Sequence, residues 1–186
     1  MLIVAITGMP GAGKSTAAQA LVDGGWRRFV MGDAVREETK RRGLQPDAKN
    51  TGDVMRDLRE KRGEAAIAEL CLRAIGDSGA ERVVVDGIRS LAEVDAFRKK
   101  AKVLLVAIHA SPARRYSFLK ERGRSDDPLS YEMFRKRDER ELKVGIGEAI
   151  AMADESLSNE RLNTKELEGS MVKLVGGWLG SDGPHS

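Results

Sequence analysis

The stretch Gly8-Met9-Pro10-Gly11-Ala12-Gly13-Lys14-Ser15 decides how the rest of this 186-residue chain is interpreted. It fits the pattern G-x-x-x-x-G-K-[ST], in which a glycine-rich backbone curls so that its N–H groups point at phosphate oxygens. The apolar run Leu2–Ile6 comes directly before it, and a helical pattern opens near Lys14. The motif requires this context, because the positive end of the helix dipole also favours an anion there. The sequence therefore predicts a binding site for the phosphates of a nucleoside triphosphate.

The residue types in this loop suit phosphoryl chemistry. Lys14 can reach the β- and γ-phosphates and is a candidate catalytic residue, and the hydroxyl of Ser15 can ligate Mg²⁺. The chain has one cysteine, Cys71, so it offers no cluster of cysteines and histidines for zinc. The residues expected to contact the nucleotide are Gly8, Pro10, Gly11, Ala12, Gly13, Lys14, Ser15 and Thr16.

Short strand patterns alternate with helical patterns along the whole chain. Alternation of this kind is typical of a parallel sheet that helices cover on both faces. Apolar residues spaced from Val54 to Ile75 mark a long helix, and a stripe from Leu167 to Trp178 marks a final one. We therefore predict an α/β fold, a three-layer α/β/α sandwich of the P-loop NTPase type. The five expected strands are Leu2–Thr7, Arg28–Met31, Arg82–Asp86, Val103–His109 and, more weakly, Glu155–Ser158.

The charge and composition exclude several classes of function. The formal net charge is +3, from 32 basic and 29 acidic residues, which is too mild to indicate a nucleic-acid-binding protein. No stretch approaches the ~18 apolar residues of a membrane-spanning helix, and the run Leu2–Ile6 has no basic residues before it, unlike a signal peptide. A single cysteine fits a reducing compartment. We expect a cytoplasmic protein without a membrane partner, and the sequence leaves its oligomeric state open.

Two further motifs follow predicted strands at the edge where open α/β sheets bind ligands. Gly32-Asp33-x-x-Arg36 resembles the acceptor-binding segment of adenylate kinases, and Asp86-Gly87-Ile88-Arg89 resembles their D-G-F-P-R segment. Over residues 1–175 the chain is similar to an uncharacterised archaeal family of adenylate-kinase-related P-loop proteins. Dephospho-CoA kinases are more distant relatives. The shared features are G-M-P-G-A-G-K-S, M-G-D, D-G-I-R-S, H-A-S-P, R-G-R-x-D-D-P and R-D-E-R-E.

This resemblance implies the strand order 2-3-1-4-5, a nucleotide-kinase type of fold with a short lid, and roles for individual residues. Arg36 and Arg89 would hold the phosphate of the acceptor, and Asp86 would sit near Mg²⁺ together with Ser15. Asp33 and Arg89 are further candidates for catalysis. The proline of the D-G-F-P-R segment is absent, since Arg89 directly follows Ile88. The residues expected to bind the acceptor are Gly32, Asp33, Arg36, Asp86, Gly87, Arg89 and Arg140.

A lid is expected near residues 121–137, where glycine, proline and paired aspartates predict a loop. Arginines on both sides of a mobile loop can close over the transferring phosphoryl group and neutralise its spreading charge. We expect Arg124 and Arg137 to act in this way, Arg122 to contact the nucleotide, and Asp127 to pair with one of the arginines. By resemblance to the same kinases, the loop after the last strand, with Asn159, would lie near the adenine base.

The predicted organisation is a single nucleotide-kinase-like domain over residues 1–179, followed by a flexible tail at 180–186. The segment from about residue 33 to about residue 76 would form a helical acceptor-binding region. Nothing resembles an N-K-x-D guanine-reading segment, so ATP is the expected phosphoryl donor on the basis of the family resemblance.

Three functions remain open at this point. The first is a kinase of the nucleoside monophosphate type, which transfers the γ-phosphoryl group of ATP to a small phosphorylated acceptor such as AMP. The second is a kinase for a hydroxyl acceptor, like dephospho-CoA kinase, in which Asp33 would act as a base. The third is an ATP-hydrolysing switch that binds a protein or RNA partner, because P-loop domains support both roles.

Overall fold

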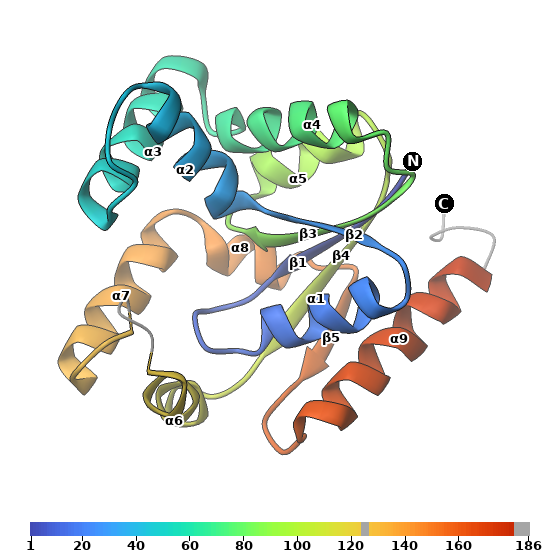
Figure 1. The fold of residues 1–186 in the computed structure, drawn as a ribbon. Helices are drawn as coiled ribbons and strands as arrows, with labels where there is room; N and C mark the ends of the chain where they lie inside the picture. The colour runs from blue at the N-terminus through green and yellow to red at the C-terminus, as the bar shows by residue number, and fades with distance from the viewer. Residues whose placement is uncertain (124–126, 181–186) are drawn as a thin grey trace.

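A five-stranded parallel sheet organises the molecule, and the computed structural model describes residues 1–123 and 127–180 (Figure 1). The strand order is β2-β3-β1-β4-β5, which confirms the predicted α/β sandwich and its topology. Two strands have their predicted bounds, two are longer by one or two residues, and the strand predicted at Arg28–Met31 begins and ends one residue earlier because Met31 starts a helix. The strands are β1 (Leu2–Thr7), β2 (Arg27–Val30), β3 (Arg82–Ile88), β4 (Lys102–His109) and β5 (Glu155–Ser158).

Nine helices connect and cover these strands in the described part of the chain. The long helix predicted between Val54 and Ile75 is wrong, because Gly63 takes a positive φ of 87° and separates two helices. Such a backbone conformation favours glycine and ends a helix. The helices are α1 (Lys14–Asp23), α2 (Met31–Arg41), α3 (Ala48–Arg62), α4 (Ala66–Ser78), α5 (Leu91–Arg98), α6 (Pro112–Arg122), α7 (Tyr131–Lys143), α8 (Ile146–Ala151) and α9 (Thr164–Gly180).

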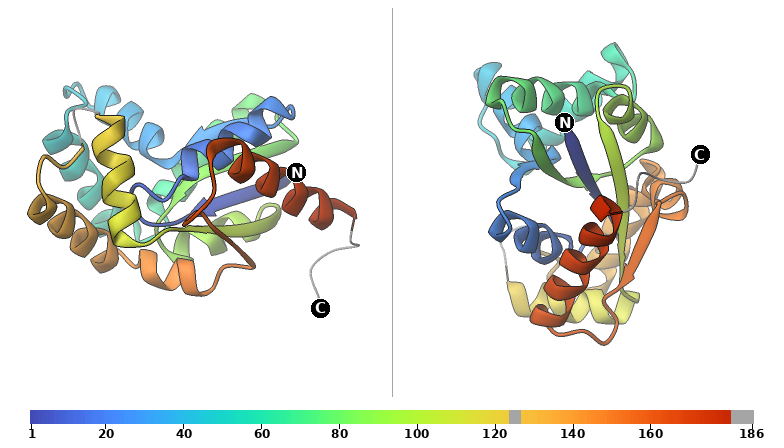
Figure 2. Two further views of the ribbon diagram at one scale, coloured as in Figure 1. Left: turned by 90° about the horizontal axis from the view of Figure 1, so that it is seen from below. Right: turned by 90° about the vertical axis from the view of Figure 1, so that its right-hand side faces the viewer.

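Alternate residues of the central strands supply the two apolar layers. Ile3 and Ala5 of β1 face one layer, with buried side chains from α2, α3, α4 and α5. Val4 and Ile6 face the other, with α1 and α9. Burial on both faces explains why β1 and β4 are nearly continuous apolar runs. Figure 2 shows the helices on both sides of the sheet.

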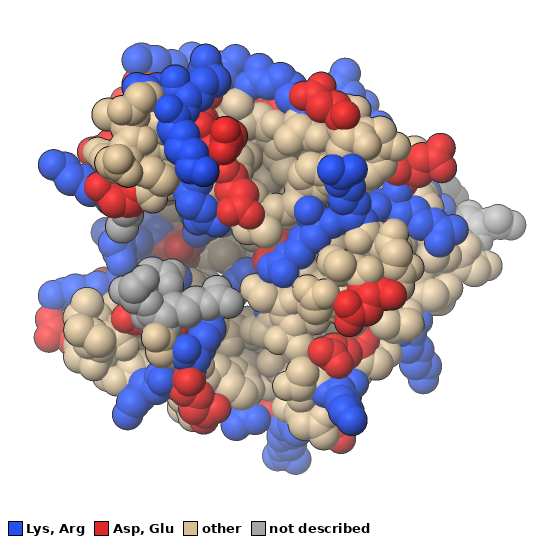
Figure 3. Space-filling view, in the orientation of Figure 1, with Lys and Arg blue, Asp and Glu red and all other residues tan. Residues whose placement is uncertain are grey.

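Two arms extend beyond the carboxyl ends of the strands. One is formed by α2 and α3 and the other by α6 and α7, and a hollow lies between them with Lys and Arg side chains on its margins (Figures 1 and 3). The helix α9 extends to Gly180, one residue into the segment predicted as a tail, and residues 181–186 lie outside the described part. No helix among the described residues is long and apolar enough to span a membrane.

Candidate nucleotide and acceptor site

The loop between β1 and α1 takes a shape that only glycine allows at two of its positions. Gly8 has a φ of 141°, and a Cβ atom there would lie 2.3 Å from the carbonyl oxygen of Ile108. Gly13 has a φ of 104°, and its Cβ atom would lie 2.5 Å from Nδ2 of Asn159. Any other residue would meet both backbone strain and a steric clash. The glycines of the motif therefore allow the loop to pack closely against β4 and against the segment after β5.

Two buried side chains hold this loop from opposite sides. Nδ2 of Asn159 donates a hydrogen bond of 3.0 Å to the carbonyl oxygen of Ala12. Nη1 of Arg115, on α6, donates to the carbonyl oxygen of Pro10 at 3.0 Å and to Asp138 of α7 at 2.9 Å. The amide of Asn159, expected to contact the nucleotide, thus also positions the loop. The fixed loop is a preorganised cradle for phosphate groups.

Lys14 lies at the start of α1 with its ammonium group folded back onto the loop. Nζ donates to the carbonyl oxygens of Gly8 at 2.6 Å and Met9 at 3.2 Å. Burial lowers the pKa of Lys14 from 10.5 to about 8, and the carboxylate of Asp86 opposes this effect. A bound phosphate would stabilise the charged form, because an adjacent anion favours the ammonium.

Ser15 and Asp86 lie close enough to share a cation. Oγ of Ser15 donates to Oδ2 of Asp86 at 3.3 Å, and Nη2 of Arg28 pairs with the same oxygen at 2.6 Å. Hydroxyl and carboxylate oxygens are the donors that Mg²⁺ prefers, and it is usually bound through one or two carboxylates plus substrate phosphates. Ser15 and Asp86 therefore fit a magnesium ion that arrives with a nucleotide. Sequence analysis did not single out Arg28, which already neutralises Asp86.

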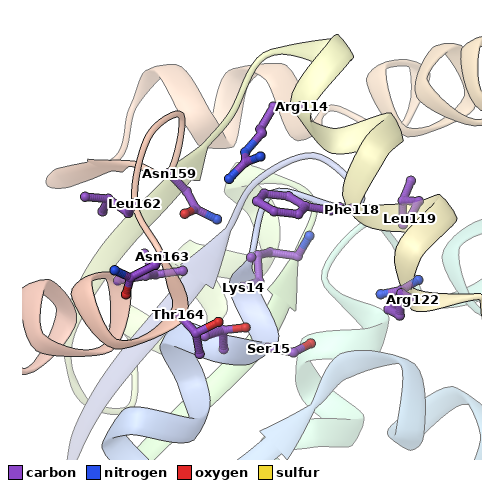
Figure 4. A pocket seen from close by; sticks show the side chains of 14 residues that line it. Lys14, Ser15, Arg114, Phe118, Leu119, Arg122, Asn159, Leu162, Asn163 and Thr164 are labelled. Atoms are coloured by element: carbon purple, nitrogen blue, oxygen red, sulfur yellow. The ribbon is translucent and has the colours of Figure 1, made fainter.

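A pocket of about 410 Å³ opens beside the loop between α6 and the segment after β5 (Figure 4). The guanidinium of Arg114 lies 4.2 Å from the centroid of the Phe118 ring, and Nε of Arg114 is buried without a hydrogen-bond partner in the described part of the chain. Flat cationic and aromatic groups of this kind can stack on a nucleobase. The pocket is lined by Gly11, Gly13, Lys14, Ser15, Thr16, Arg114, Phe118, Leu119, Arg122, Asn159, Leu162, Asn163, Thr164 and Leu167.

A second, smaller pocket of about 210 Å³ lies beside the loop, and its charged side chains come from α1, α2, α6, α7 and the end of β3. Lys14 and Ser15 face it from α1, and Asp86 and Arg89 face it from the end of β3. Arg122 of α6 and the residues Arg137 and Glu141 of α7 complete it. With Arg36 of α2, five cations and two carboxylates thus meet beside the phosphate loop. We call this space the junction pocket.

A third pocket, of about 540 Å³, lies between α2, α3 and the segment that joins β3 to α5. Gly32, Arg36, Gly87 and Arg89 line both this pocket and the junction pocket, so the two spaces adjoin at these residues. We call the third pocket the acceptor pocket. Its apolar walls are Met31, Val35, Met55 and Ile67, and its polar lining includes Thr51, Arg59 and Glu93.

The inner end of the acceptor pocket holds an ion pair that sequence analysis did not single out. Nη2 of Arg59 lies 3.1 Å from Oε1 of Glu93, whose Oε2 accepts from the backbone N–H of Arg89 at 2.8 Å. Burial raises the pKa of Glu93, and its hydrogen bond with the Arg89 N–H opposes the rise. Oγ1 of Thr51 is buried without a hydrogen-bond partner among the described residues. A bound polar ligand can satisfy such a group.

The predicted lid residues are only partly brought together. Arg122 pairs with Asp127 on both carboxylate oxygens, with Nε to Oδ2 at 2.9 Å, and Arg137 lies 3.6 Å from Asp127. The expected pairing of Asp127 with a lid arginine is thus present. Arg124 lies outside the described residues.

Two predicted site residues lie away from the pockets that the other predicted residues line. Arg140 is exposed on the outer face of α7 together with Lys136 and Lys143. It is three residues from Arg137 but does not line the junction pocket. Asp33 is 63 % exposed and pairs with Arg36 one turn along α2, and it lines none of the three pockets.

Comparisons with known proteins agree with this architecture. Residues 4–142 match the protein family described as an AAA domain. A UPF0200 protein of Hyperthermus butylicus is 43% identical over 174 residues, which cover 94% of this chain and 93% of that protein. A UPF0200 protein of Methanocaldococcus jannaschii is 48% identical over 163 residues, covering 87% of this chain and 83% of that protein.

Solved structures with low sequence identity share the fold. The crystal structure of TT1252 from Thermus thermophilus superposes with a TM-score of 0.67 at 21% identity and covers 97% of this chain and 98% of that one. Shikimate kinase from Bacteroides thetaiotaomicron gives a TM-score of 0.60 at 15% identity, with 96% and 98% covered. The chain therefore shares its fold with these structures, one of which is a shikimate kinase.

Proposed function

Because the chain belongs to the UPF0200 family and has the fold of P-loop kinases, we propose that it is a phosphotransferase of the nucleoside monophosphate kinase type. It would transfer the γ-phosphoryl group of ATP, bound with Mg²⁺, to the phosphate of a small nucleotide such as AMP. The observation that carries this proposal is that the junction and acceptor pockets adjoin at Arg36 and Arg89, which line both. Two guanidinium groups at that boundary suit an acceptor that already carries a phosphate.

The size and lining of the acceptor pocket fit the remainder of such an acceptor. Its volume of about 540 Å³ lies in the usual range for small-molecule sites. Met31, Val35 and Met55 offer an apolar surface for a flat ring, and Thr51 offers a buried hydroxyl to a polar edge. A phosphate at the boundary and a ring inside the pocket would place the acceptor across this space.

The charges in the junction pocket support a phosphate nucleophile in preference to a hydroxyl. Its two carboxylates among the described residues are Asp86, which pairs with Arg28, and Glu141, which pairs with Arg89. Both carboxylates are thus already engaged in ion pairs, and neither stands unpaired beside the loop as a general base for a hydroxyl acceptor. An ionised acceptor phosphate needs no general base. Transfer then depends on positioning and charge neutralisation.

Each part of the chain would then have a defined task. The loop and Lys14 would hold the triphosphate, while Ser15 and Asp86 would hold Mg²⁺, which neutralises charge on the phosphates. Arg122 and Arg137 would stabilise the transferring group, and Arg114 with Phe118 would contact the base of ATP. Asn159 and Arg115 would keep the loop in shape. The lid would close over this assembly and exclude water.

A hydroxyl acceptor is the second candidate, and two observations favour it. Some structural neighbours are kinases named for shikimate and for a sugar. Asp33 lies in the first turn of α2, directly after the carboxyl end of β2, with an exposed carboxylate. Closure of the α2–α3 arm would have to bring this side chain to the junction pocket before it could serve as a base.

The decisive experiment is a transfer assay with ATP labelled at the γ-phosphate and Mg²⁺. The acceptors are the common nucleoside monophosphates, dephospho-CoA and shikimate, each with the wild-type chain and with Lys14→Ala as the blank. A labelled nucleoside diphosphate would support the proposal and identify the base. A labelled hydroxyl acceptor would favour the second candidate. Slow release of labelled phosphate with every acceptor would contradict both and favour an ATP-hydrolysing switch.

A further inference from the structure

Arg89 lies between the acceptor pocket and α7, and its guanidinium contacts both. Nε lies 3.1 Å from Oε2 of Glu141, and Nη1 lies 3.6 Å from Sδ of Met55. Met55 lines the acceptor pocket, whereas Glu141 lines the junction pocket. The contact through Nε therefore holds one edge of the guanidinium while Nη1 is directed toward the acceptor pocket.

We propose that Glu141 is a positioning residue that holds Arg89 ready for the phosphate of the acceptor and links the lid helix α7 to the acceptor pocket. This inference rests on the proposed function. A free arginine side chain samples many rotamers, and fixing it on binding costs free energy. An ion pair formed before binding removes part of that cost from the binding of the acceptor.

The burial of the pair supports this role. The side chain of Glu141 is 15% exposed, whereas that of Arg89 is 37% exposed. The carboxylate is thus largely withdrawn from solvent and the guanidinium remains accessible to a ligand. Glu139 of the same helix differs, because its side chain is 57% exposed and lies 3.7 Å from Arg135, which is also on α7. Of these two ion pairs, only that of Glu141 with Arg89 joins α7 to the segment that follows β3.

The packing of the α7–α8 turn keeps this geometry in place. A Cβ atom at Gly145, which follows α7, would lie 3.7 Å from the carbonyl oxygen of Arg89 and 3.8 Å from Cβ of Ser90. The carboxyl-terminal end of α7 therefore contacts the backbone that carries Arg89. A movement of α7 during lid closure would be transmitted to the guanidinium through Glu141.

Three variants test the role of Glu141. Glu141→Ala removes the side chain, Glu141→Gln keeps its size and one carbonyl oxygen, and Glu139→Gln is the matched control on the same helix. The first measurement needs no acceptor: hydrogen exchange at Nε of Arg89 by ¹⁵N NMR, with the signal assigned by its loss in Arg89→Lys. We expect exchange to be about tenfold faster in Glu141→Ala and unchanged in Glu139→Gln, because the adjacent carboxylate of Glu141 shields the proton and its negative charge repels the hydroxide that catalyses exchange.

The second measurement is the steady-state KM for AMP and for ATP. We expect the KM for AMP to rise about five- to tenfold in Glu141→Ala and less in Glu141→Gln, with the KM for ATP unchanged. Unchanged exchange at Arg89, or equal effects on the two KM values, would overturn the positioning role. The wild-type transfer assay decides the proposed function separately, because a chain that labels no nucleoside monophosphate fails before any variant is compared.

Discussion

The nucleotide side and the acceptor side of this site are held together by different forces. On the nucleotide side, neutral backbone carbonyls of the loop accept hydrogen bonds from Asn159 and Arg115, and the glycines leave no room for another shape. On the acceptor side, the important arginines are paired with carboxylates: Arg36 with Asp33, and Arg89 with Glu141.

This difference predicts how each side responds to a ligand. The phosphate loop is already formed, so binding a triphosphate requires little rearrangement and the loop acts as a preorganised set of donors. On the acceptor side, an incoming phosphate must compete with the carboxylates that already pair with the arginines. Substitutions should therefore affect catalysis most strongly at the loop and acceptor binding most strongly at the arginines.

The largest effect is expected for Lys14→Ala. Removing a cation that contacts the transferring group should lower kcat by about 10³-fold, because transfer depends on charge neutralisation. The melting temperature should change little, since Nζ makes only two hydrogen bonds to the loop. Radiolabel transfer and thermal unfolding measure the two effects. Lys173→Ala, at an exposed position of α9, is the control, and near-normal turnover by Lys14→Ala would refute the assigned role of the loop.

The next effect is expected for Arg89→Ala. Loss of a charge-assisted contact with the acceptor phosphate should raise the KM for AMP about 10- to 100-fold, because such contacts contribute about 1.5–3 kcal/mol. The KM for ATP should stay within about twofold of the wild-type value. Initial-rate kinetics with each substrate varied in turn give both constants. Arg73→Ala, exposed on α4, serves as the control, and equal losses for both substrates would remove Arg89 from the acceptor site.

Asp33→Asn separates the two kinase candidates and should have a smaller effect. With a phosphate acceptor, the substitution only weakens the pair with Arg36, and kcat should fall less than about tenfold. With a hydroxyl acceptor, loss of a general base should lower kcat about 10²- to 10⁴-fold. Transfer rates with AMP and with dephospho-CoA distinguish these outcomes. A loss of the larger size would move the assignment to the second candidate.

The same difference explains what sequence analysis could predict. The sheet and the phosphate loop follow from local signals: continuous apolar strands, a glycine-rich loop and a helix that begins at Lys14, whereas the strand order follows from the family resemblance. The roles of Glu141 and Arg115 depend on partners 52 and 23 residues away, Arg89 and Asp138, and nothing local distinguishes them from other charged residues of α6 and α7.

The two predicted arginines of α7 lie on different faces of the helix. Arg137 is predicted for the lid and Arg140 for the acceptor, and residues three apart on a helix point in neighbouring but different directions. Arg137 and Glu141, four apart, share the face that lines the junction pocket, whereas Arg140 faces outward. Tertiary packing sets which face of α7 contacts the site, and here the buried side chain is Phe134. The charged residues that make up most of α7 leave no clear apolar stripe from which this face could be predicted.

The smallest effect concerns the acceptor arm itself, which is held by the network of Glu38 with Arg41 and Arg42. Glu38 is buried, and its hydrogen bonds with Arg41 lower the pKa of Glu38 from 4.5 to about 2. A carboxyl whose pKa is lower in the folded state stabilises the protein above its unfolded pKa, and this contribution is lost as the pH falls from about 4.5 toward 2.

Glu38→Gln should therefore reduce the free energy of unfolding by about 1–2 kcal/mol at pH 7, with the difference shrinking in that acidic range. Urea unfolding of wild type, Glu38→Gln and the exposed control Glu37→Gln at several pH values measures it. A difference that is constant with pH would show that the arm depends on the shape of Glu38 and not on its charge, and the contrast between the two sides of the site would then rest on Arg36 and Arg89 alone.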